Sequence, residues 1–108
     1  MDIDEKKAGH YYELAAMAGD VMARHNLGAM EGQAGNMDRA LQHWMIAVRD
    51  GNPRSLKNIK IMYMDGHATN DDYADALRSY QAYLDEIKSD QRDEAAKLSE
   101  VRYYESTS

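Results

Sequence analysis

The feature that most constrains the fold of this chain is a helical pattern that occurs three times. Each copy has an alanine, an aromatic residue four positions later, and apolar residues seven and eight positions after the alanine. These offsets place the side chains in one stripe along an α-helix, with the small alanine where two helices approach most closely. The copies align without gaps at residues 7–16, 39–48 and 75–84.

A second type of helix lies between these copies. Residues 23–28 align with residues 55–60 at an offset of 32, and Tyr63 and Gly66 complete the later copy. The repeating unit is therefore a helix pair of about 32 to 36 residues. Because one pair cannot bury its own apolar face, neighbouring pairs must stack, which is typical of an α-solenoid. We predict an all-α solenoid of about six helices arranged as antiparallel pairs.

Turn and capping residues predict where the helices begin and end. Gly19 and Gly51 stand eleven residues after the alanine of their copies, where a glycine ends a helix in left-handed geometry. Asp20 and Asn52 are placed as N-caps, and Pro53 suits the first helical position. Candidate N-caps of the other helices are Asn36, Thr69 or Asn70, and Ser89 or Asp90. The predicted helices span residues 5–18, 21–31, 37–50, 53–65, 71–88 and 90–104.

The length of 108 residues fits one small domain. We predict a single domain over residues 1–108, with a first helix at 5–18, repeat units at about 21–50 and 53–88, and a C-terminal capping helix at about 90–104. Ile87 stands where the earlier copies have glycine, so the helix of the third copy should run longer. No run of alternating β-branched residues competes with the helical pattern, so strands are not expected.

The repeat resembles the Sel-1-like repeat, a relative of the tetratricopeptide repeat (TPR). Leu27 and Gly28 match the Leu-Gly pair of that family, and Tyr12 and Trp44 fill its aromatic position. Further residues that match its spacing are Ser55, Ile59, Tyr63, Gly66, Asp72, Ala76 and Tyr80. The resemblance covers residues 6–88 and implies a right-handed superhelix that binds proteins.

The chain departs from the family pattern at three places. Lys60 stands where the family has glycine, Asp75 stands where it prefers lysine, and the loop at residues 31–35 is four residues shorter. The array is also short for this family, which has more repeats as a rule.

The charge of the chain limits the classes of partner. There are 19 acidic and 13 basic residues, a formal net charge of −6, which argues against binding to nucleic acid or to an anionic membrane. No apolar stretch is long enough for a membrane span. The chain has no cysteine, which excludes disulfides and thiolate metal sites and favours a reducing, intracellular and cytoplasmic location.

Candidate chemistry gives no catalytic, metal or cofactor assignment. The four histidines are scattered without metal-ligand spacing, and the serines lack a nucleophile motif. Acidic residues cluster near the start of the fifth predicted helix, where the helix dipole favours them. These acids are Asp65, Asp71, Asp72 and Asp75. The Met and Tyr stripe is interpreted as core. We therefore predict a protein that is not an enzyme and carries no cofactor.

The resemblance implies that the first helix of each pair lines a concave surface. In this chain those helices carry polar and basic residues although the whole chain is acidic, so we predict a groove that binds a protein or peptide. The candidate partner-binding residues are Arg24, Asn26, Arg54, Lys57, Asn58 and Lys60. Two alternatives stay open: these residues form an ordinary solvated helix flank, or the chain is a structural module that associates with itself through exposed repeat ends.

Overall fold

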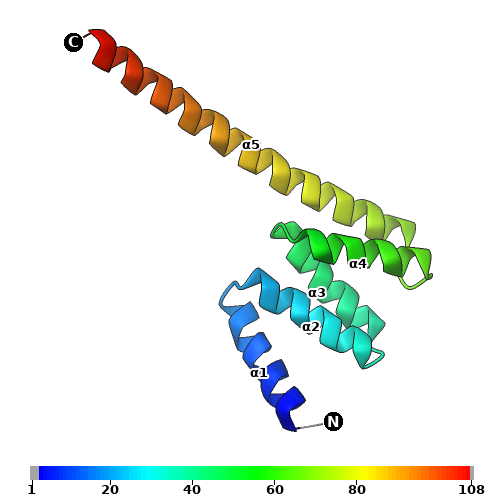
Figure 1. Cartoon of the computed structure of the whole chain (residues 1–108). Coiled ribbons are helices and arrows are strands. Elements are labelled where there is room, and N and C mark those ends of the chain that lie inside the picture. The colour runs from blue at the N-terminus through cyan, green and yellow to red at the C-terminus, as the bar shows by residue number, and fades with distance from the viewer. Residues whose placement is uncertain (1–2, 108) are drawn as a thin grey trace.

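A computed structural model describes the backbone of residues 3–107 and the side chains of residues 6–98. Over this part of the chain the fold is all-helical, with no strand. The described residues form five helices. Each packs against the next in the sequence, and α3 also contacts α5 (Figure 1). Their bounds are α1 Ile3–Met17, α2 Val21–Gln33, α3 Met37–Arg49, α4 Pro53–Met64 and α5 Asn70–Thr107.

Most of the predicted helix boundaries are confirmed. Gly19 and Gly51 have φ angles of 95° and 98°, the left-handed geometry that ends a helix. Asp20 and Asn52 cap α2 and α4, because each side-chain oxygen accepts a hydrogen bond from the backbone N–H three residues later, at 3.1 and 2.9 Å. Pro53 occupies the first turn of α4.

Asn36 behaves differently from the other predicted caps. It occupies the N-cap position of α3 but makes no capping hydrogen bond through its side chain. Its amide instead donates to a carboxylate oxygen of Glu31 at 2.8 Å, so it ties the end of α2 to the following turn.

The main core is centred on α3. Trp44 and Val48 of this helix pack with Ile59 and Met62 of α4 and with Ala76 of α5, and all five side chains are buried. A smaller cluster joins α1 to α2 through Ala16, Ala23 and Leu27. Of the alanines that open the three copies of the pattern, Ala40 and Ala76 are buried in the main core, as the pattern predicts, whereas Ala8 is half-buried and belongs to neither cluster.

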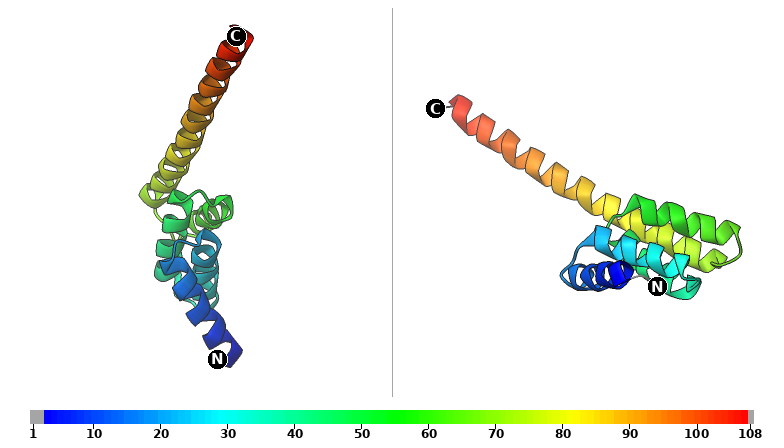
Figure 2. Two further views of the ribbon diagram at one scale, coloured as in Figure 1. Left: turned by 90° about the vertical axis from the view of Figure 1, so that its left-hand side faces the viewer. Right: turned by 60° about the horizontal axis from the view of Figure 1, so that its bottom comes forward.

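The C-terminal part differs from the prediction of two helices at 71–88 and 90–104. Both belong to α5, which has 38 residues, so residues 3–107 form five helices rather than about six and the predicted cap is not a separate element. The physical reason is that no glycine or proline follows Gly66, and Ser89 and Asp90 cap a helix only where the backbone leaves helical geometry. The described side chains from Lys88 onward are exposed, and Figure 2 shows α5 running out past the other helices.

Candidate functional site

A groove lies between α2 and α4, with α3 beneath it. Its volume is about 400 Å³. Apolar side chains form most of its surface, and amide, carboxylate and imidazole groups stand among them. The lining residues are Ala29, Gly32, Gln33, Met37, Trp44, Asn58, Ile61, Met62, Asp65 and His67. Since α2 and α4 are the first helices of the two repeat units, the groove lies between equivalent elements of successive repeats.

Trp44 is held at the bottom of the groove by the small residues of α2. A Cβ atom on Gly28 would lie only 2.4 Å from the Trp44 Nε1 atom, so the indole needs glycine at this position. The Nε1–H donates a hydrogen bond to the backbone carbonyl of His25 at 3.1 Å. Trp44 is 7% exposed and is the only tryptophan of the chain, so its fluorescence reports on this groove.

A buried polar contact joins α2 to α4 beside the groove. The His25 ring and the Ser55 hydroxyl are hydrogen-bonded, with 2.7 Å between Nδ1 and Oγ. Burial lowers the pKa of His25, and the positive charge of Arg54 lowers it further. Ser55 is fully buried, so this Ser–His pair fastens two helices together and does not present a nucleophile to solvent.

A second histidine links α2 to α3. The guanidinium of Arg24 lies 3.4 Å from Nδ1 of His43. Burial and then Arg24 lower the pKa of His43, while the carboxylates of Glu31 and Glu13 act in the opposite direction. Both histidines therefore favour their neutral forms in the folded chain.

Of the six predicted partner-binding residues, one lines the groove. Asn58 lines the groove, and Arg54 lies on α4 near His25. Arg24 is directed toward α3 instead, and Asn26 is half-buried in α2. Lys57 and Lys60 are exposed on α4 and are not among the groove-lining residues.

The sequence pattern predicts Trp44 as a core residue, which is confirmed, but it does not predict that Trp44 also lines a groove. A signal was present in Gly28 and Gly32, two glycines four residues apart on the helix opposite the aromatic position. Small residues at this spacing leave a bare strip on one helix face. Which aromatic residue fills that strip depends on how the helices pack.

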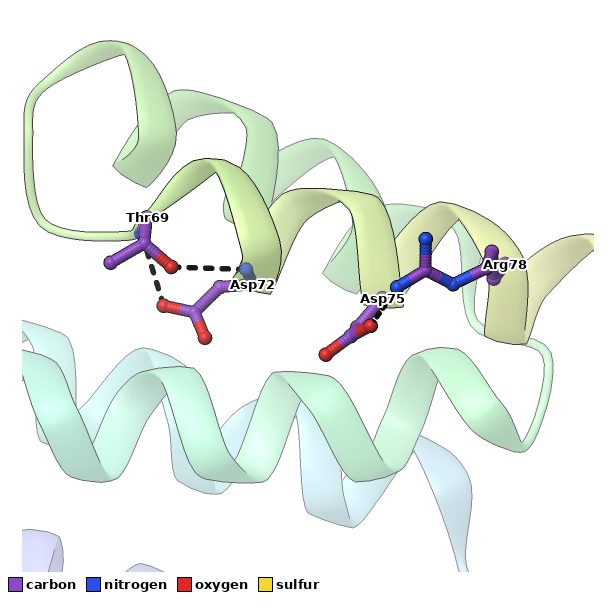
Figure 3. A network of polar contacts seen from close by, with 4 residues as sticks. All are labelled: Thr69, Asp72, Asp75 and Arg78. Atoms are coloured by element: carbon purple, nitrogen blue, oxygen red, sulfur yellow. Dashed lines mark hydrogen bonds and ion pairs between the residues drawn. The ribbon is translucent and has the colours of Figure 1, made fainter.

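The acidic cluster has an ordinary role at the start of α5. The Thr69 hydroxyl accepts a hydrogen bond from the Asp72 backbone N–H at 3.1 Å, and the Asp72 carboxylate accepts one from the Thr69 backbone N–H at 3.0 Å. This reciprocal pair is a capping box. Asp75 forms an exposed ion pair with Arg78, so the two contacts follow each other along the helix (Figure 3).

The described side chains contain no group of three or more His, Cys, Asp and Glu residues that could hold a metal ion. Within the part of the chain covered by the structure, no helix has an apolar stretch long enough to cross a bilayer. Comparison of the chain with protein-family models, with curated proteins and with solved structures finds no match.

Proposed function

We propose that the chain is a protein-interaction module, a short Sel-1/TPR-like solenoid with a right-handed superhelix, which binds a peptide segment of another protein. The single observation that carries the proposal is the apolar groove between α2 and α4 with Trp44 at its floor. Grooves lined by apolar side chains with a few convergent polar groups are the usual form of a binding site. The function is binding without catalysis or a cofactor.

The chemistry of the groove favours a particular kind of peptide. Asn58 and Gln33 offer amide groups that can pair with a peptide backbone, and the indole of Trp44 offers contact for an apolar side chain. The basic residues Arg54, Lys57 and Lys60 stand on α4, which has no acidic residue. We therefore expect a ligand with an apolar anchor residue and neighbouring acidic residues.

Selection from a displayed peptide library on the full-length chain tests the proposal, with Trp44 fluorescence as the measure of binding. Selected acidic peptides should change the emission of Trp44. Binding should weaken as salt rises, because the Debye length shrinks from about 10 Å at 0.1 M to about 3 Å at 1 M. A library that returns no peptide able to alter Trp44 emission would contradict the groove assignment.

A charge-reversal set tests the basic residues separately. The triple variant Arg54→Glu, Lys57→Glu, Lys60→Glu should lose binding of acidic peptides. A control with the same change in net charge is Lys7→Glu, Arg39→Glu, Arg49→Glu, whose positions are exposed and lie on α1 and α3 rather than on α4. Equal loss in both variants would show only an effect of net charge.

The second candidate function, self-association through a repeat end, is favoured by one observation on α1. Tyr11 and Leu14 are 65% and 56% exposed. Their equivalents in α3, 32 residues later, are His43 and Ile46, which are half-buried. The contact of Arg24 with His43 shows that this side of α3 faces α2. The corresponding side of α1 is bare within the described residues, and Tyr11→Ser with Leu14→Ser would reduce association through it.

A further inference from the structure

The segment of α5 from Lys88 to Leu98 forms an exposed surface that belongs to neither the core nor the groove. Leu84 and Ile87 are half-buried, while the side chains from Lys88 to Leu98 are exposed, and Leu98 is 62% exposed. Most of the stability of a helix in a protein comes from packing of its apolar face rather than from helix propensity. This segment therefore presents a helix that packing would stabilise.

Residues at alternating spacings of three and four positions form one stripe along α5 in a heptad pattern, and this stripe is apolar except at Gln91 and Glu94. In the first half of the helix Tyr73 and Tyr80 of this stripe pack against the main cluster, while Leu77 is 44% exposed. In the second half the same face continues beyond the other helices. The stripe comprises Tyr73, Leu77, Tyr80, Leu84, Ile87, Gln91, Glu94 and Leu98. A repeat of this kind is the pattern by which two helices form a coiled coil.

The free half of the stripe is complementary to itself when the direction of the helix is reversed. Ile87 then lies opposite Leu98 of the other helix, and Gln91 lies opposite Glu94. Two-fold symmetry makes each of these layers occur twice. The same register continues in the sequence to Val101, opposite Leu84. Apolar residues thus meet apolar residues, and the two polar residues meet each other.

Charge distinguishes this antiparallel arrangement from a parallel one. In a parallel pair, Glu94 would face Glu94 at the centre of the stripe, and like charges in that position are repulsive. In the antiparallel pair, Glu94 faces the amide of Gln91. Asp90 and Lys97 flank the stripe on the same side, so Asp90 of each copy comes beside Lys97 of the other.

We propose that residues 84–98 of α5 bind the same segment of a second copy as an antiparallel two-helix pair. This inference does not rest on the proposed groove function, because the surface is on a different helix. Two apolar layers over the described residues, with two polar layers between them, predict a weak dimer that depends on concentration.

Sedimentation velocity of the full-length chain over a range of concentrations tests the pairing. The wild-type chain should pass from monomer to dimer as concentration rises. Leu98→Glu should raise the dimer dissociation constant by about tenfold or more, a loss of about 1.4 kcal/mol. Ala96→Glu, which adds the same charge on the opposite, exposed side of the helix, is the matched control and should change the constant little.

Charge-swap variants test the antiparallel register directly. Asp90→Lys alone and Lys97→Asp alone should each weaken the homodimer, because each places like charges together at both ends of the pair. An equimolar mixture of the two variants should form a heterodimer, in which both contacts again have opposite charges.

The possible outcomes distinguish pairing through α5 from the absence of pairing and from pairing through α1. A wild-type chain that stays monomeric at millimolar concentration overturns the proposal. So does a dimer that Leu98→Glu and Ala96→Glu weaken equally, or a mixture of the charge variants that pairs no better than either alone. A dimer that is lost only with Tyr11→Ser and Leu14→Ser would instead place the interface on α1.

Discussion

Helices α1 and α3 carry the same repeat pattern at an offset of 32 residues but differ in how deeply they are buried. In α3, Ala40, Ala47 and Val48 have no exposed surface and Trp44 has 7%. In α1, only the last of the four equivalent residues, Ala16, is buried; the other three, Ala8, Tyr12 and Ala15, are half-buried.

The difference follows from the neighbours of the two helices. Helix α3 packs closely against α2, α4 and α5, whereas the close packing of α1 is against α2. The same stripe therefore produces a core only where helices cover it on more than one side, as expected of an array in which each repeat is stabilised by adjacent repeats. Substitutions of stripe residues in α3 should therefore lower the free energy of unfolding more than the equivalent substitutions in α1.

The largest expected contrast is between the aromatic residues of the two copies. Trp44→Ala should lower the free energy of unfolding by ~3–5 kcal/mol, a large part of the total for a small domain. Tyr12→Ala, at the half-buried equivalent position, should cost ~1–2 kcal/mol. Urea denaturation followed by circular dichroism measures both. Equal losses would show that burial in α1 and α3 does not set their contributions.

Glycine-to-alanine substitutions in α1 and α2 should change the free energy of unfolding in opposite directions. Gly28→Ala should destabilise the chain by ~1–3 kcal/mol, because the added methyl group overlaps the Trp44 indole. Gly9→Ala meets only the flexible end of Met30, at 3.4 Å. It should stabilise α1 by ~0.5–1 kcal/mol through its higher helix propensity. A destabilising Gly9→Ala would indicate closer packing of α1 on α2.

The two asparagines at N-cap positions give a smaller contrast. Asn52 is 5% exposed and its side chain accepts the capping hydrogen bond from Ser55, so Asn52→Ala should cost ~1–2 kcal/mol. Asn36 is exposed and makes no such bond, and Asn36→Ala should change the free energy of unfolding by ~0.5 kcal/mol or less. Thermal melts of both variants and of the wild type test this ranking. A larger loss of stability for Asn36→Ala than for Asn52→Ala would contradict it.

The smallest expected effect is a decrease in the free energy of unfolding as pH falls, caused by His25 and His43. The pKa values of His25 and His43 are lowered in the folded chain, so the unfolded chain binds protons more readily. Their contribution to stability is full above the unfolded pKa of about 6.5 and is lost as pH falls from there toward the folded pKa values. The variant His25→Gln, His43→Gln should show a flatter decline between pH 7.5 and 5.5 in urea denaturation. An unchanged slope would assign the decline to carboxylates instead.

The sequence by itself determined the helices and most of their ends. These features depend on contacts within one turn of helix, such as the N-caps Asp20 and Asn52 and the turn glycines Gly19 and Gly51. The break expected at Ser89 was wrong, because a residue able to cap a helix does not interrupt one. The predicted residue Asn58 does lie in the groove, and the role of all six candidates in binding stays a prediction.

Only the tertiary structure decided which side chains meet. The contact of His25 with Ser55 joins residues 30 positions apart, and that of Arg24 with His43 joins residues 19 apart. Trp44 lines a groove because residues of α2 and α4 come together around it. Helical periodicity fixes the face on which a residue lies, but the crossing angle and separation of two helices fix its partner. Those quantities depend on the packing of all the helices together, and local sequence does not contain them.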